Sequence, residues 1–133
     1  MKSDEQILEE IATASRGLFR MSESDYPVEP FRLGAGEAPD AATLRRAAGA
    51  SEGAEVTTRE AEEFFRPTAF VEDADGSFNP APAGRVRELS RVLTANLSEV
   101  NVYRVGEVNV AVYVLGRGAS GSWLGVSTRV VET

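Results

Sequence analysis

Carboxylates that could bind a metal ion or another cation, or transfer protons, occur near both ends of the sequence. Glu23 and Asp25 are two residues apart, and Glu132 precedes the C-terminal carboxylate of Thr133. Paired carboxylates can do acid–base work, or can bind a hard cation through oxygen. An apolar stretch with the alternation of a β-strand runs to Val131, so the terminal carboxylate is predicted to stay close to a rigid sheet. This pattern indicates a negatively charged chain end, held by a rigid scaffold, that blocks a cationic or metal site on a partner.

Two other segments resemble ligand loops but do not have the required spacing. The acidic segment 72–79 cannot place both the glycine and the terminal glutamate of a calcium loop in either frame. The glycine-rich segment 116–121 lacks the ending of a phosphate loop and opens no helix, so a hairpin turn is predicted.

The chain has no His and no Cys, which excludes imidazole bases, thiol nucleophiles and thiolate metal sites. We therefore predict no enzymatic activity, no cofactor and no metal of its own. A small hydrolase using Glu23 and Asp25 is the enzymatic alternative.

Composition and charge indicate an ordinary globular protein with a strongly acidic first part. A length of 133 residues fits one domain over residues 1–133, with 42% hydrophobic and 26% charged residues. Residues 1–83 carry 17 acidic and 8 basic side chains, whereas residues 84–133 carry 4 and 6. The net charge of −7 disfavours direct binding to nucleic acid and favours a basic partner. No signal peptide and no membrane span are expected, which predicts a cytoplasmic location.

Helical periodicity and capping residues predict the α-helices. The three longer helices are predicted over residues 3–18, 41–48 and 83–97. Ser3 and Gln6 fit a capping box for the first, and Asp40 can cap the second. Thr57 and Glu60 fit another capping box, which predicts a further helix that ends near Phe65. A long loop is then expected over residues 66–82.

The strands are concentrated in the last third of the chain. Alternation predicts a central strand, with Val108, Val110, Val112 and Val114 on one face and Ala111, Tyr113 and Leu115 on the other. A strand that starts near Val100 precedes it, and Trp123 to Val131 form the last strand. Residues 28–33 are expected to form an edge strand, because the nearby prolines lack N–H donors. Early helices followed by an antiparallel meander predict the α+β class.

Several motifs, taken together and in order, carry a resemblance to a known family. They are Gly17-Leu18, Met21-Ser-Glu-Ser-Asp-Tyr-Pro27, Phe64-Phe65, Asn96-Leu97, Val102-Tyr-Arg-Val-Gly-Glu107, Val112-Tyr-Val114 and Gly125-Val-Ser-Thr-Arg-Val-Val-Glu-Thr133. The chain closely resembles the nuclease A inhibitor family, whose members inhibit sugar-non-specific DNA/RNA nucleases. The resemblance implies a three-layer α/β/α sandwich with a mostly antiparallel sheet, similar to the plant pathogenesis-related protein fold. It also implies binding to a ββα-metal nuclease, with Glu23 and Thr133 reaching the catalytic magnesium region of that nuclease.

One feature of the family is absent. Where the family has an Asp-Trp pair in the long loop, ungapped alignment places Asp73 and Ala74. The partner-binding residues implied for this chain are Glu23, Ser24, Asp25, Asp73, Ala74, Glu132 and Thr133. A monomer that binds its nuclease 1:1 is expected. The alternative is a non-catalytic protein-binding module that has the same fold and a different partner.

Overall fold

The chain folds into helices and antiparallel strands, and most of the strands follow one another in runs of two or three. The computed structural model describes residues 2–74 and 77–132, and the side chains of all of these except Ala74. In chain order the elements are α1 (Asp4–Ser15), β1 (Leu18–Arg20), β2 (Tyr26–Pro27), β3 (Glu29–Arg32), α2 (Ala41–Ala48), β4 (Val56–Glu60), α3 (Ala61–Phe64), the 3-10 turn η1 (Pro67–Ala69), β5 (Phe70–Ala74), β6 (Ser77–Pro80), α4 (Ala83–Asn96), β7 (Ser98–Val105), β8 (Asn109–Arg117) and β9 (Trp123–Val131). The predicted α+β class is confirmed. None of the helices in the described ranges is long and apolar enough to cross a membrane.

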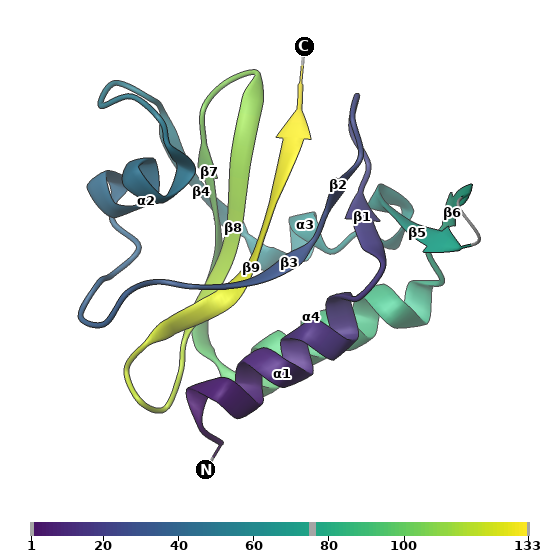
Figure 1. Cartoon of the computed structure of the whole chain (residues 1–133), viewed down its shortest axis with the longest axis horizontal. Coiled ribbons are helices and arrows are strands. Elements are labelled where there is room, and N and C mark those ends of the chain that lie inside the picture. Colours follow the sequence, from purple (N-terminus) through teal and green to yellow (C-terminus); the bar gives the residue numbers. More distant parts are fainter. Residues whose placement is uncertain (1, 75–76, 133) are drawn as a thin grey trace.

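The strands form two sheets, and all the strand pairs in them are antiparallel. One sheet has the order β2-β1-β5-β6, and the other has the order β3-β9-β8-β7-β4. In the larger sheet β8 is central and β3 is at an edge, as the sequence predicts. Figure 1 shows β9 and β1 running toward the end of the molecule at which the chain terminates, whereas β8, which is antiparallel to β9, starts at that end.

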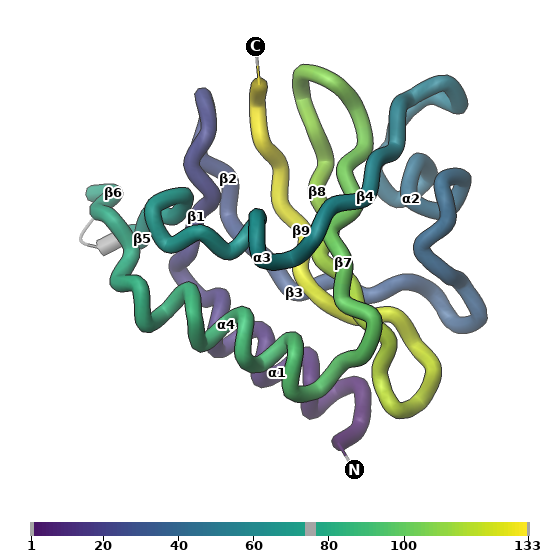
Figure 2. Tube along the Cα trace, turned by 180° about the vertical axis from the view of Figure 1, so that it is seen from behind, coloured from purple at the N-terminus to yellow at the C-terminus, as the bar shows by residue number. Residues whose placement is uncertain are grey.

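Apolar side chains cover both faces of β8, as its alternation predicts. Its buried residues divide between two clusters, with Val110, Val112 and Val114 in one and Ala111, Tyr113 and Leu115 in the other. Helices α1 and α4 lie side by side against the first face (Figures 1 and 2). Leu44 of α2 packs on the second face. Val108 does not continue the inner face, because it lies before β8 and the residue is 54% exposed.

The first helix begins as predicted but ends earlier. Ser3 Oγ accepts the N–H of Gln6 at 3.2 Å, and the Gln6 side chain accepts the N–H of Ser3 at 2.8 Å, which completes the capping box. The prediction of a helix over residues 3–18 is wrong at its end. Gly17 adopts φ +75°, a backbone conformation that favours glycine and stops the helix. Leu18 therefore starts β1 instead of closing the helical stripe.

The predicted helix with Thr57 and Glu60 as its capping box is wrong. Both residues lie in β4, which pairs with β7 from Val56↔Val105 to Glu60↔Asn101. Between β4 and Phe65 the chain forms just the single turn α3 (Ala61–Phe64), and Glu60 makes no side-chain capping hydrogen bond there. The unpaired edge of β7 offers this segment a full ladder of hydrogen bonds, which a capping motif cannot match.

The predicted structureless loop over residues 66–82 is also wrong. It contains the turn η1 and the β5–β6 hairpin, in which Val71 pairs with Pro80. Phe70 is 1% exposed and packs in the main core, so its burial fixes the start of β5. On its other side β5 pairs with β1, which gives this short strand neighbours on both edges.

Candidate functional site

Three segments that are distant in sequence meet at the end of the molecule where the chain terminates. They are residues 21–25 between β1 and β2, residues 106–108 between β7 and β8, and residues 130–132 at the end of β9; together they are called the tip below. The Glu23 N–H donates to Val131 O at 3.4 Å, and the Glu132 N–H donates to Val108 O at 2.8 Å. The tip is therefore held by backbone hydrogen bonds that join all three segments.

Ser22 binds the first segment to the last. Its Oγ accepts the N–H of Val131 at 3.0 Å and donates to the carbonyl of Ser24 at 2.6 Å. The base of the loop is fixed as well, because the Met21 N–H donates to Ala69 O at 2.8 Å. The two carboxylate-bearing segments, residues 21–25 and 130–132, are therefore held together as one unit.

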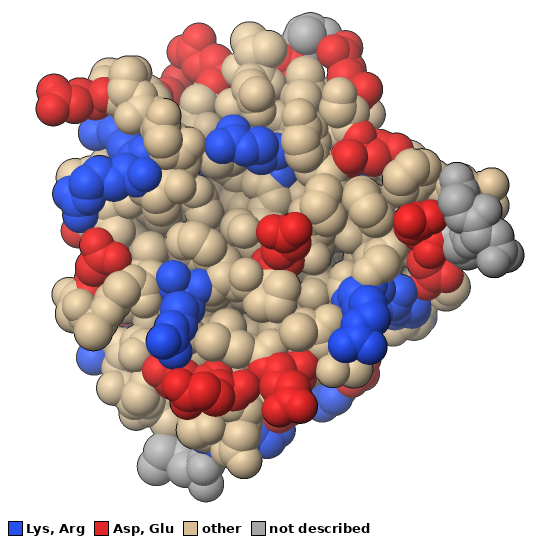
Figure 3. All heavy atoms as spheres, viewed as in Figure 1, with Lys and Arg blue, Asp and Glu red and all other residues tan. Residues whose placement is uncertain are grey.

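The exposed side chains of the tip are mainly acidic and polar. Glu23, Ser24, Asp25 and Glu132 are all exposed, so the structure brings four of the sequence-predicted residues to one surface. Figure 3 shows acidic side chains on both sides of this end of the molecule. Thr133, which the sequence also assigns to this surface, lies outside the described residues.

Arginines lie beneath these carboxylates. Arg104 of β7 forms an ion pair with Glu132, and its side chain is only 25% exposed. Together with Arg20 it lines a hollow of about 360 Å³, whose other lining residues are Met21, Ser22, Glu23, Val130, Val131 and Glu132. The guanidinium of Arg20 lies 4.7 Å from the centre of the Phe64 ring and donates to Phe64 O at 3.2 Å. Burial lowers the pKa of Arg20; nearby Arg104 and Arg66 lower it further, and Glu132 opposes them.

The hairpin residues Asp73 and Ala74 are not part of the tip. Asp73 is exposed in β5, and its N–H donates to Gly17 O at 3.1 Å, at the end of β1 opposite to the tip. The three residues of β1 therefore separate this point from the start of the loop, which is about 10 Å of strand. Ala74 is the last residue of β5. Directly across the ladder from Asp73 is Phe78, which is 51% exposed and contacts the ring of Phe19 edge-on at 5.0 Å.

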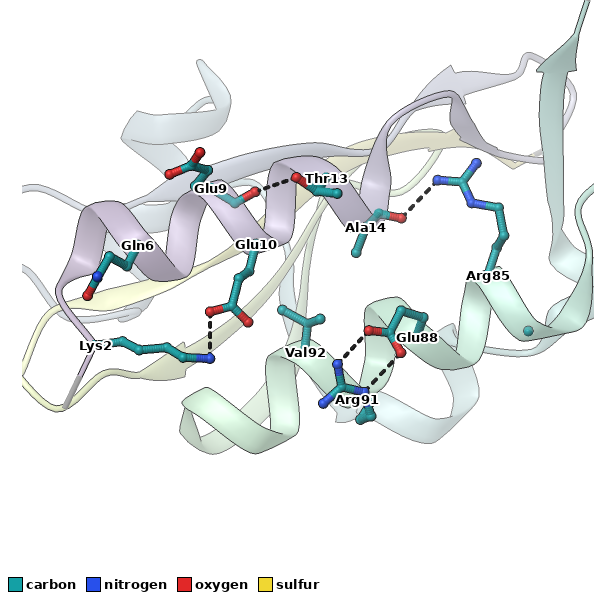
Figure 4. A pocket seen from close by; sticks show the side chains of 11 residues that line it. Lys2, Gln6, Glu9, Glu10, Thr13, Ala14, Arg85, Glu88, Arg91 and Val92 are labelled. Carbon is teal, nitrogen blue, oxygen red and sulfur yellow. Dashed lines mark hydrogen bonds and ion pairs between the residues drawn. The ribbon is translucent and has the colours of Figure 1, made fainter.

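A larger hollow of about 670 Å³ lies between α1 and α4, as Figure 4 shows. Its charged side chains are largely paired: Lys2 with Glu10 at 2.6 Å, and Arg91 with Glu88. Arg85 donates to the carbonyls of Ala14 and Arg16 at 3.1 and 2.7 Å, and so closes the end of α1. These contacts are those of two packed helices, and we assign no binding role to the hollow.

The structure adds three residues that the sequence did not single out for the site, namely Ser22, Arg104 and Val108. Ser22 and Arg104 fall inside motifs that carry the family resemblance, but no spacing rule connects either residue with the C-terminus. Within residues 2–74 and 77–132, no group of three or more acidic side chains is arranged to hold a metal ion.

The fold and the site define a small α+β protein with a braced, acidic tip. Comparison with protein families agrees with the resemblance noted in the sequence. The profile of the nuclease A inhibitor-like protein family matches residues 5–133, and the chain belongs to this family. No curated protein matches the chain significantly.

Proposed function

We propose that this chain inhibits a sugar-non-specific ββα-metal endonuclease by inserting its tip into the active site. Membership of the nuclease A inhibitor-like family supports the inhibitory role. The observation that carries the mechanism is a pair of hydrogen bonds between the Glu23 loop and the end of β9. Ser22 Oγ accepts from the Val131 N–H, and the Glu23 N–H donates to Val131 O. Because of these bonds, the carboxylates of the Glu23 loop and of the tail, meaning the residues from 130 to the C-terminus, approach a partner together.

The chemistry of such a block follows from the preferences of magnesium. Mg²⁺ takes oxygen ligands and keeps several of its waters, so a carboxylate can replace a substrate phosphate oxygen or hold a metal-bound water. In this proposal Glu23 and the C-terminal carboxylate of Thr133 do so, while Ser24, Asp25 and Glu132 contact the surrounding protein. A groove built for phosphates is positively charged and attracts an acidic surface.

The β5–β6 hairpin is proposed as a second contact. A stable interface buries about 800 Å² on each partner, which is more than one loop and one tail supply. Asp73 and Ala74 belong to this contact, and the exposed ring of Phe78 is the type of side chain that often dominates binding energy. Phe19 supports the Phe78 ring from β1, the same strand that leads into the tip.

The remaining parts of the proposal concern the protein as a whole. Residues 1–133 form one nuclease-inhibitor-like domain with the three-layer architecture of pathogenesis-related proteins. The protein is a cytoplasmic monomer without enzymatic activity that binds its nuclease 1:1. The alternative, a protein-binding module with a different partner, is favoured by Ala74 at the position where the family has a tryptophan.

A titration tests this function. A purified ββα-metal nuclease is assayed on plasmid DNA with Mg²⁺ and increasing amounts of the wild-type chain, of Glu23→Gln and of a variant that lacks Thr133. Both variants should inhibit at least tenfold more weakly than wild type and keep their circular dichroism and melting temperature. The control Glu52→Gln changes an exposed carboxylate in the α2–β4 connection and should inhibit normally. Unchanged DNA cleavage at micromolar wild-type chain would refute the proposal and favour the alternative.

A further inference from the structure

We infer that Arg104 is the positioning residue of the tip, holding the end of the chain through Glu132 so that the tail meets its partner already ordered. The inference rests on the proposed function for its consequence in binding, but its geometry belongs to the free protein. It also changes the role proposed above for Glu132. The carboxylate of Glu132 pairs with Arg104 within the chain, so it orders the tail instead of contacting the nuclease.

The position of Arg104 suits this role. In the ladders of the larger sheet it stands opposite Val112 of β8, which in turn stands opposite Thr128 of β9. Glu132 is four residues beyond Thr128, so the long side chain of Arg104 spans β8 toward the tail. Three-quarters of the Arg104 side chain is buried, whereas that of Glu132 is 52% exposed. The arginine is thus the fixed member of the pair and the glutamate is the member that it restrains.

The tail needs such a restraint. The β8–β9 ladder ends at Asn109↔Val131, and the backbone bond from the Glu132 N–H to Val108 O continues it by one step within the described residues. Terminal residues beyond a ladder are usually poorly ordered unless something ties them down. Tail residues that were disordered in the free protein would have to become ordered on binding, which weakens affinity.

Arg104 also reduces the repulsion within the tip. Glu23 and Glu132 lie on two segments that are hydrogen-bonded to each other, and like charges on neighbouring segments repel. Arg104 faces Glu132 directly, and Arg20 lies close enough for the charge of Glu132 to affect its pKa. Arg20 is itself held in place by the Phe64 and Phe70 rings, at 4.7 and 5.5 Å from their centres. Two anchored cations therefore lie beneath the acidic groups of the tip.

The test compares Arg104→Ala, Arg104→Lys and Glu132→Gln with wild type. Arg117→Ala is the matched control, because it removes the same charge from an exposed position at the opposite end of β8. In the free protein, amide hydrogen exchange at Glu132 should be at least about threefold faster in Arg104→Ala than in wild type or the control. The Kd for the nuclease should rise about tenfold, mainly through faster dissociation. Arg104→Lys should restore part of both effects.

A double variant measures whether Arg104 acts through Glu132, and the same assays include results that would overturn the inference. If Arg104 acts through Glu132, the variant that combines Arg104→Ala with Glu132→Gln should bind no more weakly than Arg104→Ala alone. Unchanged exchange and unchanged Kd in Arg104→Ala would overturn the inference, as would equal losses in Arg117→Ala. If the wild-type chain does not bind the nuclease, the proposed function fails. The exchange measurement on the free protein still decides whether Arg104 orders the tail.

Discussion

Replacing Ser22 by alanine tests whether the loop and the tail of the tip act as one unit. The Ser22 hydroxyl accepts from the Val131 N–H at 3.0 Å and donates to the carbonyl of Ser24 at 2.6 Å. Alanine has no group that can do either. The backbone bond from the Glu23 N–H to Val131 O would be left, and at 3.4 Å it is near the limit of hydrogen-bond length.

The size of the effect follows from these two bonds. A typical hydrogen bond contributes about 1 kcal/mol net, and a buried N–H that loses its partner costs about 1–3 kcal/mol. Val131 is partly exposed, so water replaces some of the loss, and we expect Ser22→Ala to lower the free energy of unfolding by about 1–2 kcal/mol. If the same bonds order the tip for binding, the Kd for the nuclease should rise by up to about tenfold, since 1.4 kcal/mol corresponds to a factor of ten.

The assay pairs thermal unfolding with the inhibition titration. Ser51→Ala, at an exposed serine in the α2–β4 connection, serves as the control and should change neither quantity. A lower melting temperature combined with a Kd within twofold of wild type would refute the reasoning. That result would mean that the loop and the tail bind independently of the bond between them.

Three further predictions concern other elements. Gly125→Ala should lower the free energy of unfolding by more than about 3 kcal/mol in denaturant titrations, because its Cβ would lie 1.7 Å from Val114 O. Phe78→Ala should raise the Kd for the nuclease about tenfold in the titration and leave the melting temperature nearly unchanged, because the ring is half exposed. The hydrogen bond from the Thr43 N–H lowers the pKa of Asp40 below its ordinary 3.8. This capping contribution is therefore fully present above pH 3.8 and is lost as the pH falls through the folded pKa, a loss that Asp40→Asn should remove from acid-unfolding curves.

The elements that could be predicted from the sequence are those whose signal is local. Helix α4 and strands β8 and β9 carry an uninterrupted period, and the caps at Ser3 and Asp40 involve residues only three positions apart. The errors occur where a distant partner decides the structure. Thr57 and Glu60 fit a helix cap locally, but they form a strand because they pair with the edge of β7, about 40–50 residues later in the chain. The β5–β6 hairpin depends in the same way on β1 and on the burial of Phe70.

The same distinction explains what the sequence reveals of the site. Glu23 and the C-terminus are recognisable because a motif and a chain end mark them, whereas the groups that hold them together carry no such mark. Ser22 and Val131 are separated by 109 residues, and Arg104 and Glu132 by 28. A serine that bonds the backbone and an arginine that pairs with a glutamate are common surface patterns, so neither predicts a site until the fold brings its partner into contact. The recognisable carboxylates supply the charge, and these unmarked contacts determine whether that charge reaches a partner in a fixed arrangement.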